Sequence, residues 1–314
     1  KMKTEEERES AADNKEMFSI ALAFGGIVLA IYVNTAFPTV ASGDSGELAF
    51  CSCSLGVGHP PGYPLFIMVG YLFTKIIPFG SPGFRVNCVS CFCGSVAAVF
   101  LYLFCCRWYS WRRIPYASYL ALIPAGIFAF APLFWHYNIH AEVFSMSNMF
   151  IAIQLYLLQR FWELCLRKDI TDEQPVRVAC LGAFVVGLGL SNQHAIVFYS
   201  APIVLAVILM DLSSRRRLVG LGGLPGLCVS LLAGLSPYAY LAWSSKHAPL
   251  GTWGDQSTSE GFFRHVLRRE YGTLKLYSGE DAAKTPLHAM AALYLADLSS
   301  NTLLLGPLLA LAGA

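Results

Sequence analysis

The run MFSIALAFGGIVLAIYVNTAF, residues 17–37, decides the class of fold. It contains no charged side chain, and roughly 20 apolar residues in a helix cross about 30 Å of bilayer hydrocarbon. A charged segment precedes the run, as in a signal peptide. However, the apolar stretch is longer than a signal-peptide core, and no small-x-small cleavage site closes it. The sequence therefore predicts an uncleaved membrane anchor.

The remainder of the chain repeats this pattern. Hydrophobic residues make up 55% of the 314 residues and charged residues 13%, whereas globular proteins carry about 25% charged residues. The mean hydropathy is +0.53. The composition predicts an all-α polytopic membrane protein with about eight transmembrane helices. They are expected near 17–37, 86–106, 115–133, 143–160, 178–196, 197–211, 219–242 and 293–314.

Charge and cysteine content exclude two other classes of function. The net charge is +2, and the basic residues form short clusters between apolar runs, so no nucleic-acid-binding face is expected. Almost all of the ten cysteines lie inside apolar runs, where small residues pack well. The segment CVSCFC (88–93) has no histidine or acidic partner within it, so we predict no metal site.

Basic clusters set the expected topology. RWYSWRR (107–113), RFWELCLRK (160–168) and SSRRRL (213–218) lie on the cytoplasmic side if the positive-inside rule holds. All three basic clusters fall on the cytoplasmic side only if PLFIMVGYLFTKIIPF (64–79) does not span the membrane. This segment is then expected to lie along the lumenal surface. Residues 1–16 then form a cytoplasmic segment, and residues 38–85 lie in the lumen.

This topology brings polar residues from four distant stretches to the lumenal side. Charged groups close to hydrocarbon are costly and functional by default. The first stretch is ASGDSGELAFCSCSLGVGHPPGYP (41–64), and the last is a long polar segment over 244–284. Between them lie HYNIHAEVFS (136–145) and SNQH (191–194). We therefore expect one functional site at this membrane face.

Several of these motifs are long and uncommon. GDSGEL (43–48), LGVGHPPGYPLF (55–66), PFGSPGFRVN (78–87), HAEVFSMSN (140–148), SNQH and TWGDQSTSEGFFRHVLRREYGT (252–273) resemble the transmembrane protein 260 family. That family belongs to the GT-C superfamily of membrane glycosyltransferases. The resemblance runs from about residue 18 to the end of the chain. Family members continue with further spans and a soluble lumenal region, whereas this chain stops in LLLGPLLALAGA. We therefore expect residues 17–314 to be an incomplete GT-C-like domain.

The resemblance implies an activity, a donor and a location. Members are protein O-mannosyltransferases of the endoplasmic-reticulum membrane. They transfer mannose from dolichyl phosphate to Ser or Thr of folded lumenal, secretory or cell-surface domains, and their superfamily keeps a catalytic Asp in the first lumenal loop. The lipid-linked sugar is a substrate, and no cofactor is implied.

The chemistry of such a transfer needs two kinds of group. A carboxylate accepts the proton of the attacking hydroxyl. The departing lipid phosphate is an anion, so it needs a positive charge more than a proton. A single displacement inverts the anomeric carbon, by analogy with glycosidases. Neither a metal nor a nucleotide is required.

The candidate base is Asp44, since Gly43 and Gly46 let the backbone bring it close to the membrane plane. The alternative is that Asp44 only caps a helix that begins near Ser45. Glu47, three residues later on the same helical face, either completes a capping arrangement or positions the base or acceptor.

The remaining candidates are donor- or substrate-binding residues, each with a structural alternative. His59 places an imidazole in a stiff turn, and Arg268 is the candidate clamp for the donor phosphate. Asp255 either binds sugar hydroxyls or caps a helix beginning near Thr258. The other candidates are His140, Glu142, Asn192, His194 and Tyr271.

The predicted helix after Thr258 is amphipathic. We expect Phe262, Val266 and Tyr271 to face the membrane, and Arg264, His265, Arg268 and Arg269 to face the polar side.

Three other functions stay open at this point. A lipid-linked-sugar glycosyltransferase could act on a glycan or a lipid instead of a protein. A non-catalytic scaffold would also fit the truncated end. A secondary transporter would have inverted repeats and polar residues near the membrane midplane, and the sequence shows neither.

Overall fold

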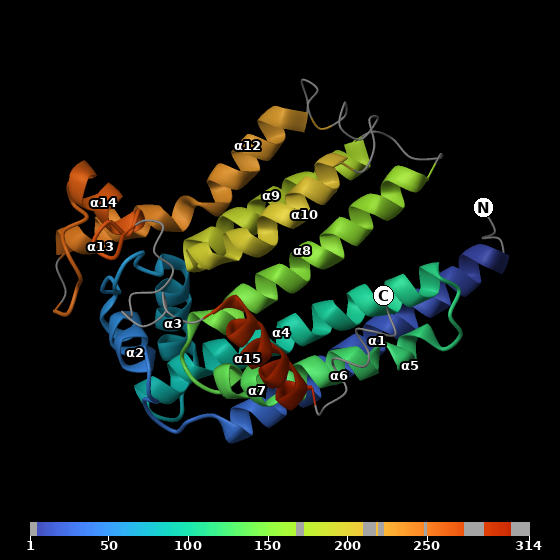
Figure 1. The fold of residues 1–314 in the computed structure, drawn as a ribbon, viewed down its shortest axis with the longest axis horizontal. Coiled ribbons are helices and arrows are strands. Elements are labelled where there is room, and N and C mark those ends of the chain that lie inside the picture. Colours follow the sequence, from blue (N-terminus) through green and yellow to red (C-terminus); the bar gives the residue numbers. More distant parts are fainter. Residues whose placement is uncertain are drawn as a thin grey trace.

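The computed structural model describes residues 5–167, 173–209, 218, 223–247, 250–272 and 286–302. These residues form helices and turns, with no strand among them (Figure 1). In chain order the α-helices are α1 (Glu5–Thr35), α2 (Ser45–Ser54), α3 (Pro64–Ile76), α4 (Pro82–Trp111), α5 (Ala117–Leu120), α6 (Leu122–Phe130), α7 (Pro132–Asn138), α8 (Val143–Leu166), α9 (Glu173–Asn192), α10 (Val197–Leu209), α12 (Gly223–Gly234), α13 (Ala239–His247), α14 (Ser259–Val266) and α15 (Leu287–Asn301).

Five helical segments are long and apolar enough to cross a membrane, and α5 to α7 form a sixth candidate that is bent by 66°. The five are Asn14–Thr35, Pro82–Trp111, Val143–Leu166, Glu173–Asn192 and Gly223–His247. The chain is therefore a multi-pass, all-helical membrane protein, as predicted. The predicted number of about eight spans is too high for the described residues.

Two of the predicted spans account for the difference. The segment predicted at 197–211 belongs to an apolar helix over His194–Leu209. That helix is only about 24 Å long at 1.5 Å per residue, which is short of the hydrocarbon thickness. The span predicted at 293–314 overlaps α15, and its residues beyond Thr302 lie outside the described part of the chain.

Helix α3 is also too short to span, since its 13 residues reach about 20 Å. Arg85 at the start of α4 closes its C-terminal end by donating from Nη1 to the carbonyl of Thr74 at 3.1 Å and from Nε to that of Phe79 at 3.1 Å. This geometry fits the prediction that 64–79 does not cross the bilayer.

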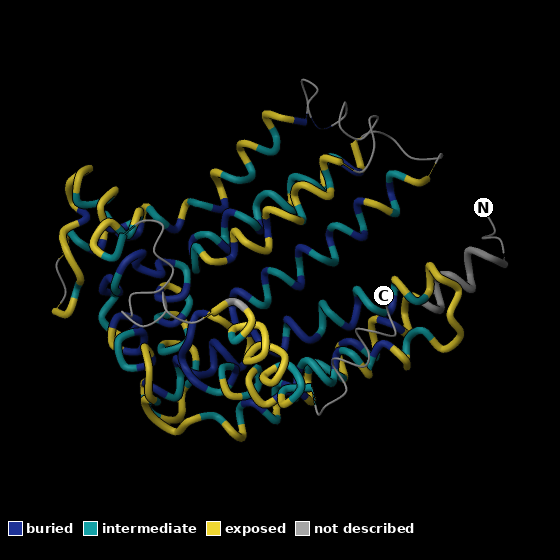
Figure 2. The backbone as a smooth tube through the Cα atoms, viewed as in Figure 1, coloured by how far each residue is buried: buried dark blue, intermediate teal, exposed yellow. Residues whose placement is uncertain are grey.

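Helix α4 forms the centre of the structure and packs against α1, α3, α6 and α8. Small residues allow this close approach. A Cβ atom at Gly94 would collide with the side chain of Asn138, and Cys88, Cys91 and Cys93 are buried without disulfide bonds. Buried residues gather where α2, α3 and α4 meet, while large apolar side chains on the outer helices are exposed, as a membrane environment requires (Figure 2).

Asn87 on α4 connects two loops at the polar end of the bundle. Its Nδ2 donates to the carbonyls of Phe37 and Thr39, both at 2.8 Å, and its Oδ1 accepts from the backbone N–H of Ala141 at 2.8 Å. The side chain is fully buried. A buried amide satisfied in this way fixes both partners. The loop after α1 and the loop before α8 are thus held to one rigid helix.

The loop between α2 and α3 is held from the C-terminal part of the chain. Four successive carbonyl groups over residues 55–58 accept hydrogen bonds from α13, α14 and the loop between them. The pairs are Ser244 Oγ to Leu55 at 2.6 Å, Tyr240 OH to Gly56 at 2.8 Å, Trp253 N to Val57 at 3.0 Å and His265 Nε2 to Gly58 at 3.1 Å. These bonds join segments 184 to 207 residues apart into one end of the molecule.

Candidate active site

Asp44 lies where the loop after α1 turns into α2. Gly43 takes the left-handed conformation (φ +75°) that allows this turn, and α2 begins at Ser45 as predicted. Asp44 occupies the cap position, but its side chain makes no capping hydrogen bond. The side chain is 55% exposed, so the carboxylate is available to a ligand.

Glu47 and His59 form a tight pair behind Asp44. His59 Nδ1 donates to Glu47 Oε2 at 2.8 Å, the His59 backbone N–H donates to Glu47 Oε1, and Tyr63 OH lies 2.8 Å from His59 Nε2. Burial opposes the charge on both groups. The hydrogen bonds and the mutual charge outweigh burial, so the pKa of Glu47 lies below and that of His59 above its ordinary value. The ionised Glu47 therefore holds the His59 ring in place and favours its protonated form.

Asp44, Glu47 and His59 together form a carboxylate–histidine cluster. His59 Nε2 lies 3.9 Å from Asp44 Oδ2, and one potential ligand atom from each residue lies within 4.8 Å of the others. These atoms could surround a metal ion by spacing alone. Both ring nitrogens of His59 are already engaged, by Glu47 and by Tyr63. The bonds present fit a hydrogen-bonded proton-handling group better than an open metal site.

Glu142 adjoins the carboxylate–histidine cluster through Asp44. It is buried, and its Oε1 accepts the backbone N–H of Asp44 at 3.3 Å. Burial and then the nearby charge of Asp44 raise the pKa of Glu142 to about 7. Gly43 is required here, since a Cβ atom would lie 3.0 Å from Glu142 Oε1. Ser90 on α4 bonds both the N–H and the carbonyl of Glu142, so α4 positions this residue too.

The segment 250–272 covers the cluster. Helix α14 starts after Thr258, whose Oγ1 accepts from the N–H of Gly261 at 3.1 Å, which confirms the predicted start. Arg264 and Arg269 are exposed, as predicted for the polar side, but the predicted facing of Phe262, Val266 and His265 is wrong. Phe262 and Val266 pack on a buried protein cluster instead of lipid, and His265 is buried against Gly58. The helix also ends at Val266, so a single helical face does not continue to residue 271.

Arg268 follows this helix in a left-handed conformation (φ +52°). Its Nε is buried and has no hydrogen-bond partner among the described residues. Its guanidinium carbon lies 5.8 Å from the centre of the Tyr271 ring, which in turn lies 6.4 Å from the His59 ring. The positive charge of Arg268 acts on His59 and on His194. The structure therefore brings a cation with an unused donor to the carboxylate–histidine cluster.

Other predicted site residues bond within the fold. Asn192 is buried and donates to the Val143 carbonyl at 2.9 Å. His140 is buried with Nδ1 2.7 Å from the His136 carbonyl. His194 Nε2 lies 2.6 Å from the hydroxyl of Tyr238.

Asp255 is exposed and organises the loop before α14. Its Oδ1 accepts from the backbone N–H of Ser257 at 2.9 Å and from Ser245 Oγ at 3.2 Å. It is not the cap of α14, because Thr258 takes that position.

The sequence of this site has clear relatives. Residues 44–217, more than half of the chain, match the family described as the protein O-mannosyl-transferase TMEM260 N-terminal domain. The chain belongs to this family. It is 38% identical over 275 residues to the protein O-mannosyl-transferase tmem260 of Dictyostelium discoideum, covering 85% of this chain and 32% of the relative.

The mouse protein O-mannosyl-transferase TMEM260 is 38% identical over 254 residues, which cover 81% of this chain and 34% of the relative. The chain thus spans about a third of the length of these curated relatives of the TMEM260 family. No solved structure matches it.

The TMEM260 family match covers only part of the site. Asp44, Glu47, His59 and Glu142 lie inside it, while Arg268 lies beyond it. The sequence analysis did not select Tyr63, Trp253 or His265. Tyr63 lies four residues after His59 beyond the same turn, and Trp253 lies in a polar loop, so a local sequence pattern pointed to both. No local sequence pattern pointed to His265, because its partner Gly58 is 207 residues away.

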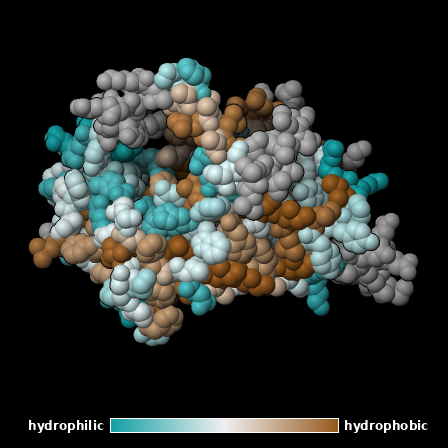
Figure 3. All heavy atoms as spheres, turned by 60° about the horizontal axis from the view of Figure 1, so that its bottom comes forward, coloured by the Kyte–Doolittle hydropathy of each residue, from teal (hydrophilic) through white to brown (hydrophobic). Residues whose placement is uncertain are grey.

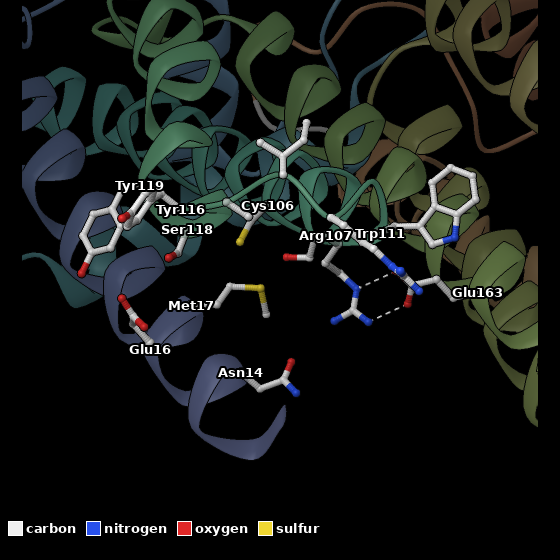
Figure 4. Close-up of a pocket in the computed structure, with 14 residues that line it drawn as sticks. Asn14, Glu16, Met17, Cys106, Arg107, Trp111, Tyr116, Ser118, Tyr119 and Glu163 are labelled. Atoms are coloured by element: carbon white, nitrogen blue, oxygen red, sulfur yellow. Dashed lines mark hydrogen bonds and ion pairs between the residues drawn. The ribbon is translucent and has the colours of Figure 1, made fainter. Parts of the chain in front are cut away.

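A large cavity in this member of the TMEM260 family lies elsewhere. It holds about 780 Å³ and is lined by the start of α1, the end of α4 and the loop before α5 (Figure 4). Arg107 in its wall is paired with Glu163, with Nη2 2.6 Å from Oε2. Figure 1 places these elements at the opposite end of the helices from α2 and α14. The cavity is therefore separate from the candidate active site.

Proposed function

We propose that this chain is the membrane part of a protein O-mannosyltransferase that transfers mannose from a lipid phosphate to Ser or Thr. One observation carries the proposal: an exposed carboxylate (Asp44) lies 3.9 Å from the His59 imidazole, and the Arg268 guanidinium lies beside Tyr271, whose ring is next to the same imidazole. Transfer from a sugar phosphate needs this combination of base and phosphate contact. Relatives named as protein O-mannosyl-transferases support the assignment.

In this mechanism Asp44 accepts the proton of the acceptor hydroxyl as its oxygen bonds to the anomeric carbon. The bond from that carbon to the phosphate oxygen breaks, and the lipid phosphate leaves with the electron pair. Arg268 stabilises the departing phosphate charge. The displacement inverts the anomeric centre.

The neighbouring groups keep the base in position. Glu47 fixes the His59 ring, whose Nε2 lies 3.9 Å from Asp44 Oδ2. Glu142 holds the Asp44 backbone, and its pKa of about 7 keeps it partly neutral near neutral pH. A partly neutral Glu142 limits repulsion between the two carboxyl groups. No metal is needed for any of these steps.

We place the site at the lumenal face of the endoplasmic-reticulum membrane, with dolichyl phosphate mannose as donor and folded secretory or cell-surface domains as acceptors. Figure 3 shows hydrophilic residues at the left end of the molecule, around a hollow, and hydrophobic residues over its middle. This distribution fits a polar site at one end of a membrane-embedded body. Residues 1–16 lie in the cytoplasm in this arrangement.

The function is tested in cells that lack this gene. Secreted and cell-surface proteins are analysed by intact mass and glycopeptide mapping, with the full-length gene restored as control. We expect specific loss of single hexoses from folded extracellular domains, and their return on rescue. Unchanged hexose occupancy would reject a transferase acting on protein.

The topology gives a separate prediction. Cysteines are introduced at Ser42 and Phe79, which are exposed and flank α2 and α3, in a protein whose native cysteines are replaced. A membrane-impermeant maleimide should label both positions only when the lumenal side is accessible. Labelling from opposite sides would make 64–79 a true span and reverse the orientation of every later helix.

A further inference from the structure

Trp253 stands out among the residues around His59. Its side chain belongs to the covering segment, and the residue is 43% exposed although it is one of three aromatic rings around the imidazole. The ring centres of Tyr63, Tyr271 and Trp253 lie 4.9, 6.4 and 6.5 Å from that of His59, each at a steep angle to it. The imidazole is thus surrounded by three aromatic rings, and the Trp253 ring among them is partly exposed.

Backbone hydrogen bonds hold Trp253 in its loop. The Trp253 N–H donates to the Val57 carbonyl at 3.0 Å, and its carbonyl accepts from Gln256 Nε2 at 2.6 Å. Gln256 is itself buried. The indole also stabilises the charged form of Glu47. An indole held by its edge and backbone, with part of its surface open, is suited to contact a ligand.

The surroundings define the ligand. Asp44 lies 3.9 Å from the same imidazole as Trp253, and Arg268 lies beside the Tyr271 ring that is next to this imidazole. In the proposed transfer, the sugar ring must lie between the group that takes the proton and the group that holds the phosphate. A pyranose presents one face of C–H groups, which packs against an aromatic ring, and a rim of hydroxyl groups, which bond to carboxylates.

We propose that Trp253 is the stacking surface for the hexose of the donor, and that its indole fixes the anomeric carbon between Asp44 and Arg268. Tyr271 forms a second wall of the same subsite and supports the guanidinium by a cation–π contact. This inference rests on the proposed function, since it assigns the sugar position in that reaction. It makes Trp253 a residue that binds and positions the donor sugar and takes no part in the proton transfer.

The test uses the full-length protein in detergent and two soluble probes, a mannosyl phosphate carrying a short isoprenoid tail and the same isoprenyl phosphate without sugar. Trp253→Leu should weaken binding of the sugar probe about 5- to 10-fold and leave the sugar-free probe unchanged. Trp253→Phe keeps a flat ring and should retain most of the affinity. Trp111→Leu is the matched control, because Trp111 is similarly exposed (48%) at the opposite end of the molecule.

Each other outcome decides against the inference. Equal weakening of both probes by Trp253→Leu would show that the residue only supports the loop, and unchanged binding of both would remove it from the site. Trp253→Phe behaving like Trp253→Leu would exclude ring stacking. A wild-type protein that binds neither probe would instead reject the proposed function, which separates the two failures.

Discussion

Replacing Asp44 by Asn is expected to lower mannosyl transfer roughly 10²- to 10⁴-fold, the usual contribution of a general base. Asn has the size of Asp and caps helices equally well. The Asp44 side chain makes no capping hydrogen bond in any case. Membrane insertion, abundance and thermal stability should therefore stay near those of the wild type, and only proton acceptance is lost.

The measurement is transfer of labelled mannose from a mannosyl-phospholipid to a folded acceptor domain by the full-length enzyme. Asp255→Asn is the matched control, since Asp255 is an exposed acid outside the carboxylate–histidine cluster and Asn keeps the Oδ1 that accepts from Ser257. Its transfer rate should change little. Full activity in a well-expressed Asp44→Asn enzyme would move the role of base to Glu47 or Glu142.

Replacing Arg268 by Ala is expected to lower kcat/KM about 10²- to 10³-fold, the range for removing one donor that stabilises transition-state charge. The Arg268 guanidinium carbon lies 5.8 Å from the centre of the Tyr271 ring, and no hydrogen bond to its buried Nε is found within the described residues. Arg268→Lys keeps the charge but lacks the planar fork of donors. It should recover only part of the lost rate.

Arg269 provides the control for this experiment. It is the next residue, it is exposed, and its backbone N–H bonds the Arg264 carbonyl at 3.0 Å. Arg269→Ala should change kcat/KM less than about twofold, as expected for a solvated side chain away from the chemistry. Equal losses in both alanine variants would indicate disruption of the turn after α14 instead of loss of a phosphate contact.

Apolar runs located most of the described spanning helices, but their ends were missed for a physical reason. Helix α4 extends to Trp111 and α8 to Leu166, each beyond its predicted apolar stretch. Arg107 and Glu163 lie in these extensions and neutralise one another. Hydropathy falls at such residues, while backbone hydrogen bonding continues. The apolar helix near residue 200 was predicted as a span because a short apolar helix has the same composition as a longer one.

The part of the site formed by local sequence was the most predictable. Asp44 and Glu47 are three residues apart in one helix, and His59 returns to Glu47 through a short turn. By contrast, Asn192 and His140 were selected for polarity and are buried in bonds within the fold. One sequence cannot separate a polar residue that satisfies a backbone group from one that faces a ligand, because burial demands the first as often as binding demands the second.

The hydrogen bonds to the carbonyl groups of residues 55–58 show which shortened forms of this protein would keep the proposed site. The donors to those carbonyls begin at Tyr240, beyond the stretch 44–217 by which family membership is recognised. A splice form or proteolytic fragment that ended before Tyr240 would keep its family signature intact. It would nevertheless expose these carbonyls and lose Trp253, Arg268 and Tyr271 together. A match over residues 44–217 therefore recognises the family and includes the proposed base, but it does not report whether the other half of the proposed site is present.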